Sequence, residues 1–113
     1  MTGALEITGA DRVRWQRQAA GELARILDAH PRLAAIAWTA GPAGCVLAGR
    51  VNGLAPGEQV RDVFDAWRAA LVLEEHREHQ FGGGVTWLHA AACRHLVRVR
   101  LTATVFAGQE DNR

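Results

Sequence analysis

The segment His89-Ala-Ala-Ala-Cys93-Arg-His95 brings two histidines and one cysteine close together in the sequence. Imidazole nitrogen and thiolate sulfur are good ligands for zinc. If a hairpin turn spans about Ala90 to Arg94, His89 and His95 would face each other across two strands, with Cys93 beside them. Structural zinc sites usually contain paired short spacings such as C-x-x-C, and this chain has none. We therefore keep two hypotheses for this segment: a metal site at His89, Cys93 and His95, and a hydrogen-bonded, partly buried His95 without metal.

A second group of ionisable side chains lies in the sequence EEHREH at Glu74–His79. Such side chains can transfer protons, but no partner nucleophile and no third orienting group can be named for them. Histidine and arginine are also favoured electrostatically near the C-terminus of a helix. We interpret this group as the solvated end of a helix.

A third group consists of arginines expected on the outer face of a β-sheet, together with tryptophans that could stack on bases. Arg98 and Arg100 alternate with apolar residues in the clearest strand of the chain. Nucleic-acid-binding sheets combine basic residues with exposed aromatic rings. The face could equally be solvated or be covered by a second copy of the chain. The predicted interaction residues are Arg50, Arg94, Arg98, Arg100, Trp38 and Trp87.

The composition excludes several classes of enzyme. The chain has 113 residues, and all 13 of its basic residues are arginine, with no lysine, serine or tyrosine anywhere. A lysine Schiff base, a P-loop lysine and a serine nucleophile are therefore excluded. The net charge of +1 argues modestly against non-specific binding to nucleic acid. We predict a non-enzymatic protein without a cofactor.

The sequence also predicts a cytoplasmic protein without a membrane association. No apolar run approaches the roughly 20 residues that a membrane-spanning helix needs. The N-terminal sequence MTGALEITGADR lacks the basic and apolar regions of a signal peptide. Cys45 and Cys93 are too few for a disulfide scaffold.

The periodicity of apolar residues predicts helices alternating with pairs of strands. Val60, Phe64, Trp67 and Leu71 form an apolar stripe at helical spacing, and strict alternation after His95 indicates a strand. The run of three glycines after Phe81 predicts the end of the second helix. The predicted helices are Asp11–His30 and Val60–His79, and the predicted strands are Leu33–Thr39, Cys45–Val51, Val85–His89 and His95–Phe106.

These elements predict one α+β domain over residues 1–113, with the order helix–hairpin–helix–hairpin (αββαββ). We expect a four-stranded antiparallel sheet with both helices on one face, because each apolar helix stripe must be covered. Ala4–Thr8 is a candidate for an additional N-terminal strand. Trp38 and Trp87 are separated by 49 positions, as are His30 and His79. This spacing suggests an internal duplication of residues 11–53 and 58–106.

Three segments carry a resemblance to a known group of proteins: FDAWRAAL at Phe64–Leu71, GGGVTWLHA at Gly82–Ala90, and VRLTATVF at Val99–Phe106. From about Leu23 onward the chain resembles uncharacterised small actinobacterial proteins, Streptomyces-like and often associated with mobile elements. The resemblance implies a bacterial cytoplasmic setting and no activity. In topology alone, the element order is also similar to the roadblock type of dimeric scaffold.

Three functional hypotheses follow from the sequence. The first is a small interaction or scaffold module that acts as a homodimer and binds another protein, because a short chain with this much apolar surface often buries it by symmetric pairing. The second is an accessory protein that binds nucleic acid through the arginine-bearing sheet face. The third is a metal-binding protein.

Overall fold

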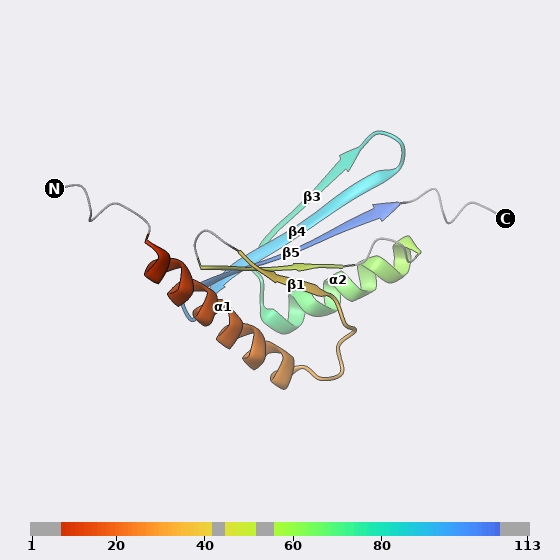
Figure 1. Ribbon diagram of the computed structural model, residues 1–113. Helices are drawn as coiled ribbons and strands as arrows, with labels where there is room; N and C mark the ends of the chain where they lie inside the picture. The colour runs from red at the N-terminus through yellow and green to blue at the C-terminus, as the bar shows by residue number, and fades with distance from the viewer. Residues whose placement is uncertain (1–7, 42–44, 52–55, 107–113) are drawn as a thin grey trace.

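The computed structural model describes residues 8–41, 45–51 and 56–106 of the chain. They form an α+β fold in which two helices pack on a five-stranded mixed sheet (Figure 1). The elements are α1 (Gly9–Ala29), β1 (Ala37–Ala40), β2 (Val46–Arg50), α2 (Gly57–Leu71), β3 (Glu75–Phe81), β4 (Val85–Arg94) and β5 (Val97–Phe106).

Helix α1 begins with a capping box. The Thr8 side-chain oxygen accepts a hydrogen bond from the Asp11 backbone N–H, and the Asp11 carboxylate accepts one from the Thr8 backbone N–H, both at 3.1 Å. These two bonds satisfy backbone donors that have no partner within the helix. The helix ends at Ala29 because Pro31 disfavours helical geometry at His30. Its bounds agree closely with the predicted helix.

Helix α2 ends eight positions earlier than the sequence predicts, at Leu71 instead of His79. The predicted apolar stripe is confirmed, since Val60, Phe64, Trp67 and Leu71 are all buried. Val72 then adopts a left-handed conformation with φ of 53°, and the Leu73 N–H donates to a carbonyl of the last helical turn. A β-branched residue is rarely left-handed, so no helix-stop signal marks this position in the sequence.

The residues after α2 form strand β3, and their prediction as helix is wrong. β3 pairs antiparallel with β4, from Glu75 opposite Ala91 to Phe81 opposite Val85. The three glycines turn the chain from β3 into β4, with φ of +80° at Gly83 and +76° at Gly84. They therefore close a hairpin and do not end a helix. Every residue of β3 is exposed, so pairing of its backbone with β4 holds this edge strand.

The sheet has the order β1-β2-β5-β4-β3, and it differs from the predicted four-stranded antiparallel sheet. The additional strand is β3, and β2 pairs parallel with β5, with Leu47 opposite Val99. The other neighbouring strands are antiparallel, including the predicted hairpin of β1 and β2. The predicted N-terminal strand Ala4–Thr8 lies outside the described residues.

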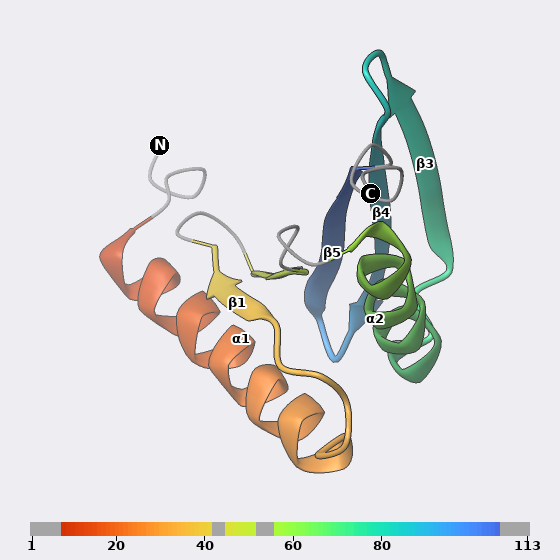
Figure 2. The same ribbon diagram turned by 90° about the vertical axis from the view of Figure 1, so that its right-hand side faces the viewer.

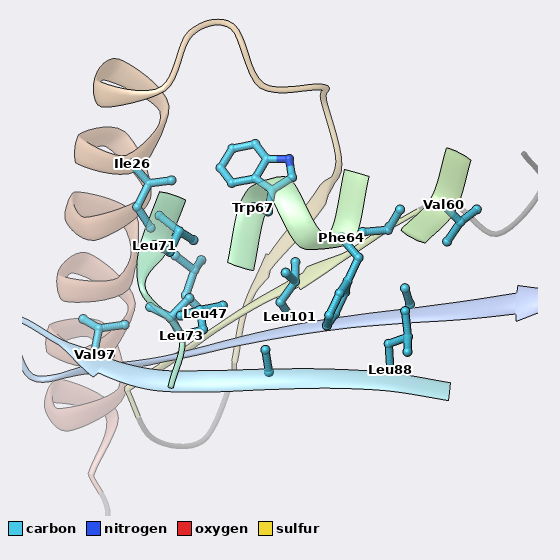
Figure 3. Close-up of a cluster of buried hydrophobic side chains, with 14 of the residues drawn as sticks. Ile26, Leu47, Val60, Phe64, Trp67, Leu71, Leu73, Leu88, Val97 and Leu101 are labelled. Carbon is cyan, nitrogen blue, oxygen red and sulfur yellow. The ribbon is translucent and has the colours of Figure 1, made fainter. Parts of the chain in front are cut away.

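Both helices pack on one face of the sheet, as predicted, and we call this the helix-covered face (Figure 2). Ile26 from α1 lies near Leu71 from α2 in the shared core, above the strand residue Leu47 (Figure 3). The indole N–H of Trp67 donates to the Ala34 carbonyl at 2.8 Å, which anchors α2 to the segment before β1. In residues 8–41, 45–51 and 56–106, no helix is long and apolar enough to cross a membrane.

Candidate functional site

We call the opposite side of the sheet the helix-free face. Its side chains lie in rows that run across neighbouring strands. Cross-strand register places Phe81, Val85 and Phe106 in one row and His79, Trp87 and Thr104 in the next. We call these two rows the apolar rows. We call the next three rows the basic rows. They contain Arg77, His89 and Thr102, then Glu75, Ala91 and Arg100, then Cys93 and Arg98.

The apolar rows are unusually exposed for their residue types. Phe81 is 54% exposed and Phe106 is 39% exposed. The ring of His79 contacts that of Phe81 edge-on, with centroids 4.5 Å apart. The Trp87 and His89 rings stack, with centroids 5.2 Å apart and planes inclined by 18°. These two pairs place aromatic rings on both β3 and β4 of the helix-free face.

Beside the apolar rows lies an open hollow of about 350 Å³, which we call the arginine hollow. Its walls carry three guanidinium groups, one imidazole and one carboxylate. Arg98 donates two hydrogen bonds to the Glu75 carboxylate, each 2.8 Å long. This bidentate pair spans β4, because Glu75 belongs to β3 and Arg98 to β5. The lining residues are Val46, Glu75, Arg77, His89, Arg98 and Arg100.

His89 is a titratable group of the hollow whose pKa depends on burial and on this surrounding charge. Burial of the imidazole lowers its pKa, and the guanidinium groups of Arg100, Arg77 and Arg98 lower it further, whereas the Glu75 carboxylate opposes them. The imidazole is therefore neutral at pH 7. Its Nδ1 atom is buried and has no hydrogen-bond partner in the described part of the chain.

The six predicted interaction residues do not share one surface. Arg50, Arg98, Arg100 and Trp87 lie on the helix-free face. Trp38 lies opposite Gly49 on the helix-covered face, where its ring meets that of Trp67 edge-on at 5.6 Å. Arg94 also lies on the helix-covered face.

Arg94 has a structural role in the fold. Its Nε donates to the Glu22 carboxylate at 3.1 Å, and its Nη1 donates to the Leu71 carbonyl at 2.9 Å. It thereby links the end of β4 to both helices. Its charge is not presented to a ligand on the helix-free face.

The three predicted metal ligands are not brought together. Strand β4 continues to Arg94, so the turn consists of His95 and Leu96 and lies beyond the position that the sequence predicts. His89 lies opposite Thr102 on the helix-free face, while His95 Nδ1 lies 2.8 Å from the Glu22 carboxylate. Residues 8–41, 45–51 and 56–106 contain no group of three or more His, Cys, Asp or Glu side chains able to hold a metal ion.

Sequence reasoning missed Arg77, Phe81 and Phe106 on the helix-free face. The sequence predicts Arg77 near the end of a helix and Phe81 just beyond it, because Glu75–Phe81 shows no alternation of apolar residues that would indicate a strand. The alternation Arg77, His79, Phe81 on one face becomes visible only once β3 is paired with β4.

Comparison of the chain with protein-family models, curated proteins and solved structures gives no significant match in any of the three. The function must therefore be inferred from the site.

Proposed function

We propose that this chain is a non-catalytic interaction module that acts as a homodimer and binds another protein. The observation that carries the proposal is the exposure of the apolar rows on a sheet face that no described helix covers. Burial of aromatic surface is the main driving force of association between proteins.

The stacking of β-sheets in known folds supports a second copy of the chain as the occupant of this surface. Two sheets can stack face to face at about 10 Å, with their inner side chains interdigitated. Around a twofold axis, the same rows of both copies would meet, so that Phe81 and Phe106 are buried against their counterparts. The basic rows would lie at the rim of such an interface, where their charges stay hydrated. The residues left outside the interface remain available for a different protein partner.

Light scattering after size exclusion tests the homodimer. We expect a dimer for the unmodified chain and a monomer for Phe106→Glu, because a carboxylate in the apolar rows would be buried without a partner. Leu27→Glu is the matched control, since Leu27 is 47% exposed on α1, away from the helix-free face. It should remain dimeric. A monomeric unmodified chain would refute the homodimer. If the chain is a dimer, affinity capture with it tests for a second protein.

A second candidate function is binding of single-stranded nucleic acid. It is favoured by one observation: Trp87 lies on the same face as Arg98 and Arg100. Stacking of bases on aromatic rings beside basic groups is the usual mode of such binding. Retention on single-stranded DNA or RNA that falls with salt and with Arg100→Ala would support this function. Absence of retention at low salt would remove it.

A further inference from the structure

We propose that the arginine hollow binds a phosphate group between Arg77 and Arg100. This inference goes beyond the proposed homodimer, because it uses the basic rows and not the apolar rows. It also holds whichever molecule carries the phosphate.

The first argument is the unbalanced charge of the hollow. Arg98 is already neutralised by Glu75 through two hydrogen bonds. Neither Arg77 nor Arg100 forms an ion pair within the described residues, and both are exposed. The hollow therefore contains three guanidinium groups against one carboxylate, Glu75, which is hydrogen-bonded to Arg98 and also interacts electrostatically with Arg77. Guanidinium groups bind phosphate oxygens with paired, charge-assisted hydrogen bonds.

The second argument is the placement of the two arginines. Arg77 on β3 and Arg100 on β5 lie on opposite sides of β4, two strands apart and one row apart along the strands. Both line the same hollow. Their flexible side chains can therefore converge on one ion from opposite sides. Glu75 and Arg98, joined by two hydrogen bonds, also line the hollow, and Glu75 lies in the same row as Arg100.

The third argument is the state of His89, which lies between the two arginines on β4. Arg77 is directly opposite His89 in the sheet, and Arg100 is one row further along β5. The field of these cations disfavours protonation of the imidazole, while Glu75 opposes this effect. Buried polar atoms without a partner, such as Nδ1 of His89, are rare in folded proteins. An anion would offset the cationic field at this position.

Titration of the isotope-labelled protein with inorganic phosphate, followed by NMR at constant ionic strength, tests the proposal. Sodium chloride serves as the reference. We expect saturable shifts at the backbone amides of Arg77, His89 and Arg100. Arg77→Gln and Arg100→Gln should each weaken binding roughly tenfold, because each removes charge-assisted hydrogen bonds. Arg12→Gln, at an exposed arginine on α1, should leave the affinity unchanged.

Shifts that are equal for phosphate and chloride, or that map to another surface, would overturn the proposal. The positions of the shifted amides in the unmodified protein test the location of the site even if a variant fails to fold. Uridine monophosphate and a short oligothymidylate then distinguish the sources of the phosphate. A nucleotide whose base stacks on Trp87 should also move the Trp87 indole signal, whereas free phosphate should not. Light scattering on the same samples reports the dimer separately, so failure of one proposal is distinguishable from failure of the other.

Discussion

The carboxylate of Glu22 in α1 lies 2.8 Å from Nδ1 of His95, in the turn between β4 and β5. The Glu22 side chain is fully buried, and it also accepts hydrogen bonds from Arg25 and Arg94. Because Glu22 belongs to the first helix and His95 to the last hairpin, this contact joins residues 73 positions apart. It holds α1 against the end of the sheet.

Glu22→Gln should destabilise the fold by about 2–3 kcal/mol. The substitution keeps the shape of the side chain but removes the negative charge that compensates the half-buried Arg94. Urea denaturation followed by circular dichroism measures the loss. Arg25→Ala is the control. Because the Arg25 side chain is 57% exposed, this substitution should lower the free energy of unfolding by less than about 1 kcal/mol. An equal loss of unfolding free energy in the two variants would show that the burial of Glu22 does not strengthen its ion pairs.

The stability of the protein should fall in acid, in part through Glu22. Burial raises the pKa of Glu22, but hydrogen bonds from Arg25, His95 and Arg94 outweigh burial and hold the pKa below its ordinary value of 4.5. The unfolded chain therefore binds this proton more readily than the folded chain does. The stabilisation is present above pH 4.5 and is lost as the pH falls through the folded pKa. Urea denaturation at several pH values measures this effect. In acid, the free energy of unfolding should fall less steeply for Glu22→Gln than for the unmodified protein.

Leu96→Gly should stabilise the protein by roughly 1 kcal/mol. The two-residue turn between β4 and β5 has positive φ at His95 (51°) and at Leu96 (69°), which favours glycine or asparagine. Leu96 is 82% exposed, so its removal leaves no cavity. Thermal unfolding measures the gain. His95→Gly relieves the same backbone conformation but loses the contact with Glu22, so it should be less stable than Leu96→Gly. The reverse order would contradict the role assigned to His95.

Arg100→Gln should raise the pKa of His89 without restoring it to 6.5. Burial is the main cause that lowers this pKa, and the guanidinium of Arg100 is the next. An NMR titration of the imidazole measures the change, with Arg12→Gln as the control. The unfolded chain takes up this proton more readily than the folded chain, so stability falls as the pH drops through 6.5. An unchanged pKa in Arg100→Gln would place Arg100 too far from His89 to act on it.

Gly49→Ala should lower the free energy of unfolding by about 1–3 kcal/mol, because the ring of Trp38 already fills the space beside Gly49. A β-carbon at Gly49 would lie 2.8 Å from the ring of Trp38, which packs in turn against Trp67. Ala48→Gly on the helix-free face of the same strand is the comparison, and it should cost only the smaller glycine penalty of about 0.5–1 kcal/mol. Denaturation of both variants measures the difference. A neutral Gly49→Ala would show that Trp38 can move aside freely.

Elements with a strong apolar periodicity can be predicted from the sequence alone. The stripe from Val60 to Leu71 predicts α2, and the alternation after Val97 predicts β5, because burial of one face dictates these patterns. Thr8 and Pro31 mark the ends of α1 through local hydrogen bonding and steric exclusion. The sequence also predicts Arg98 and Arg100 on the outer face of the sheet, whereas it leaves open which face carries Trp38 and Trp87.

The strand conformation of β3 and the grouping of the site residues depend on tertiary contacts. Glu75–Phe81 has no apolar pattern of its own, and it becomes a strand because β4 offers a free edge for backbone pairing. The turn at His95 and Leu96 shifts the register of the last hairpin, which separates His89 from His95. Glu22 is buried because ion pairs from distant residues compensate its charge. Contacts of this range depend on how the strands align in space, and local sequence does not encode that alignment.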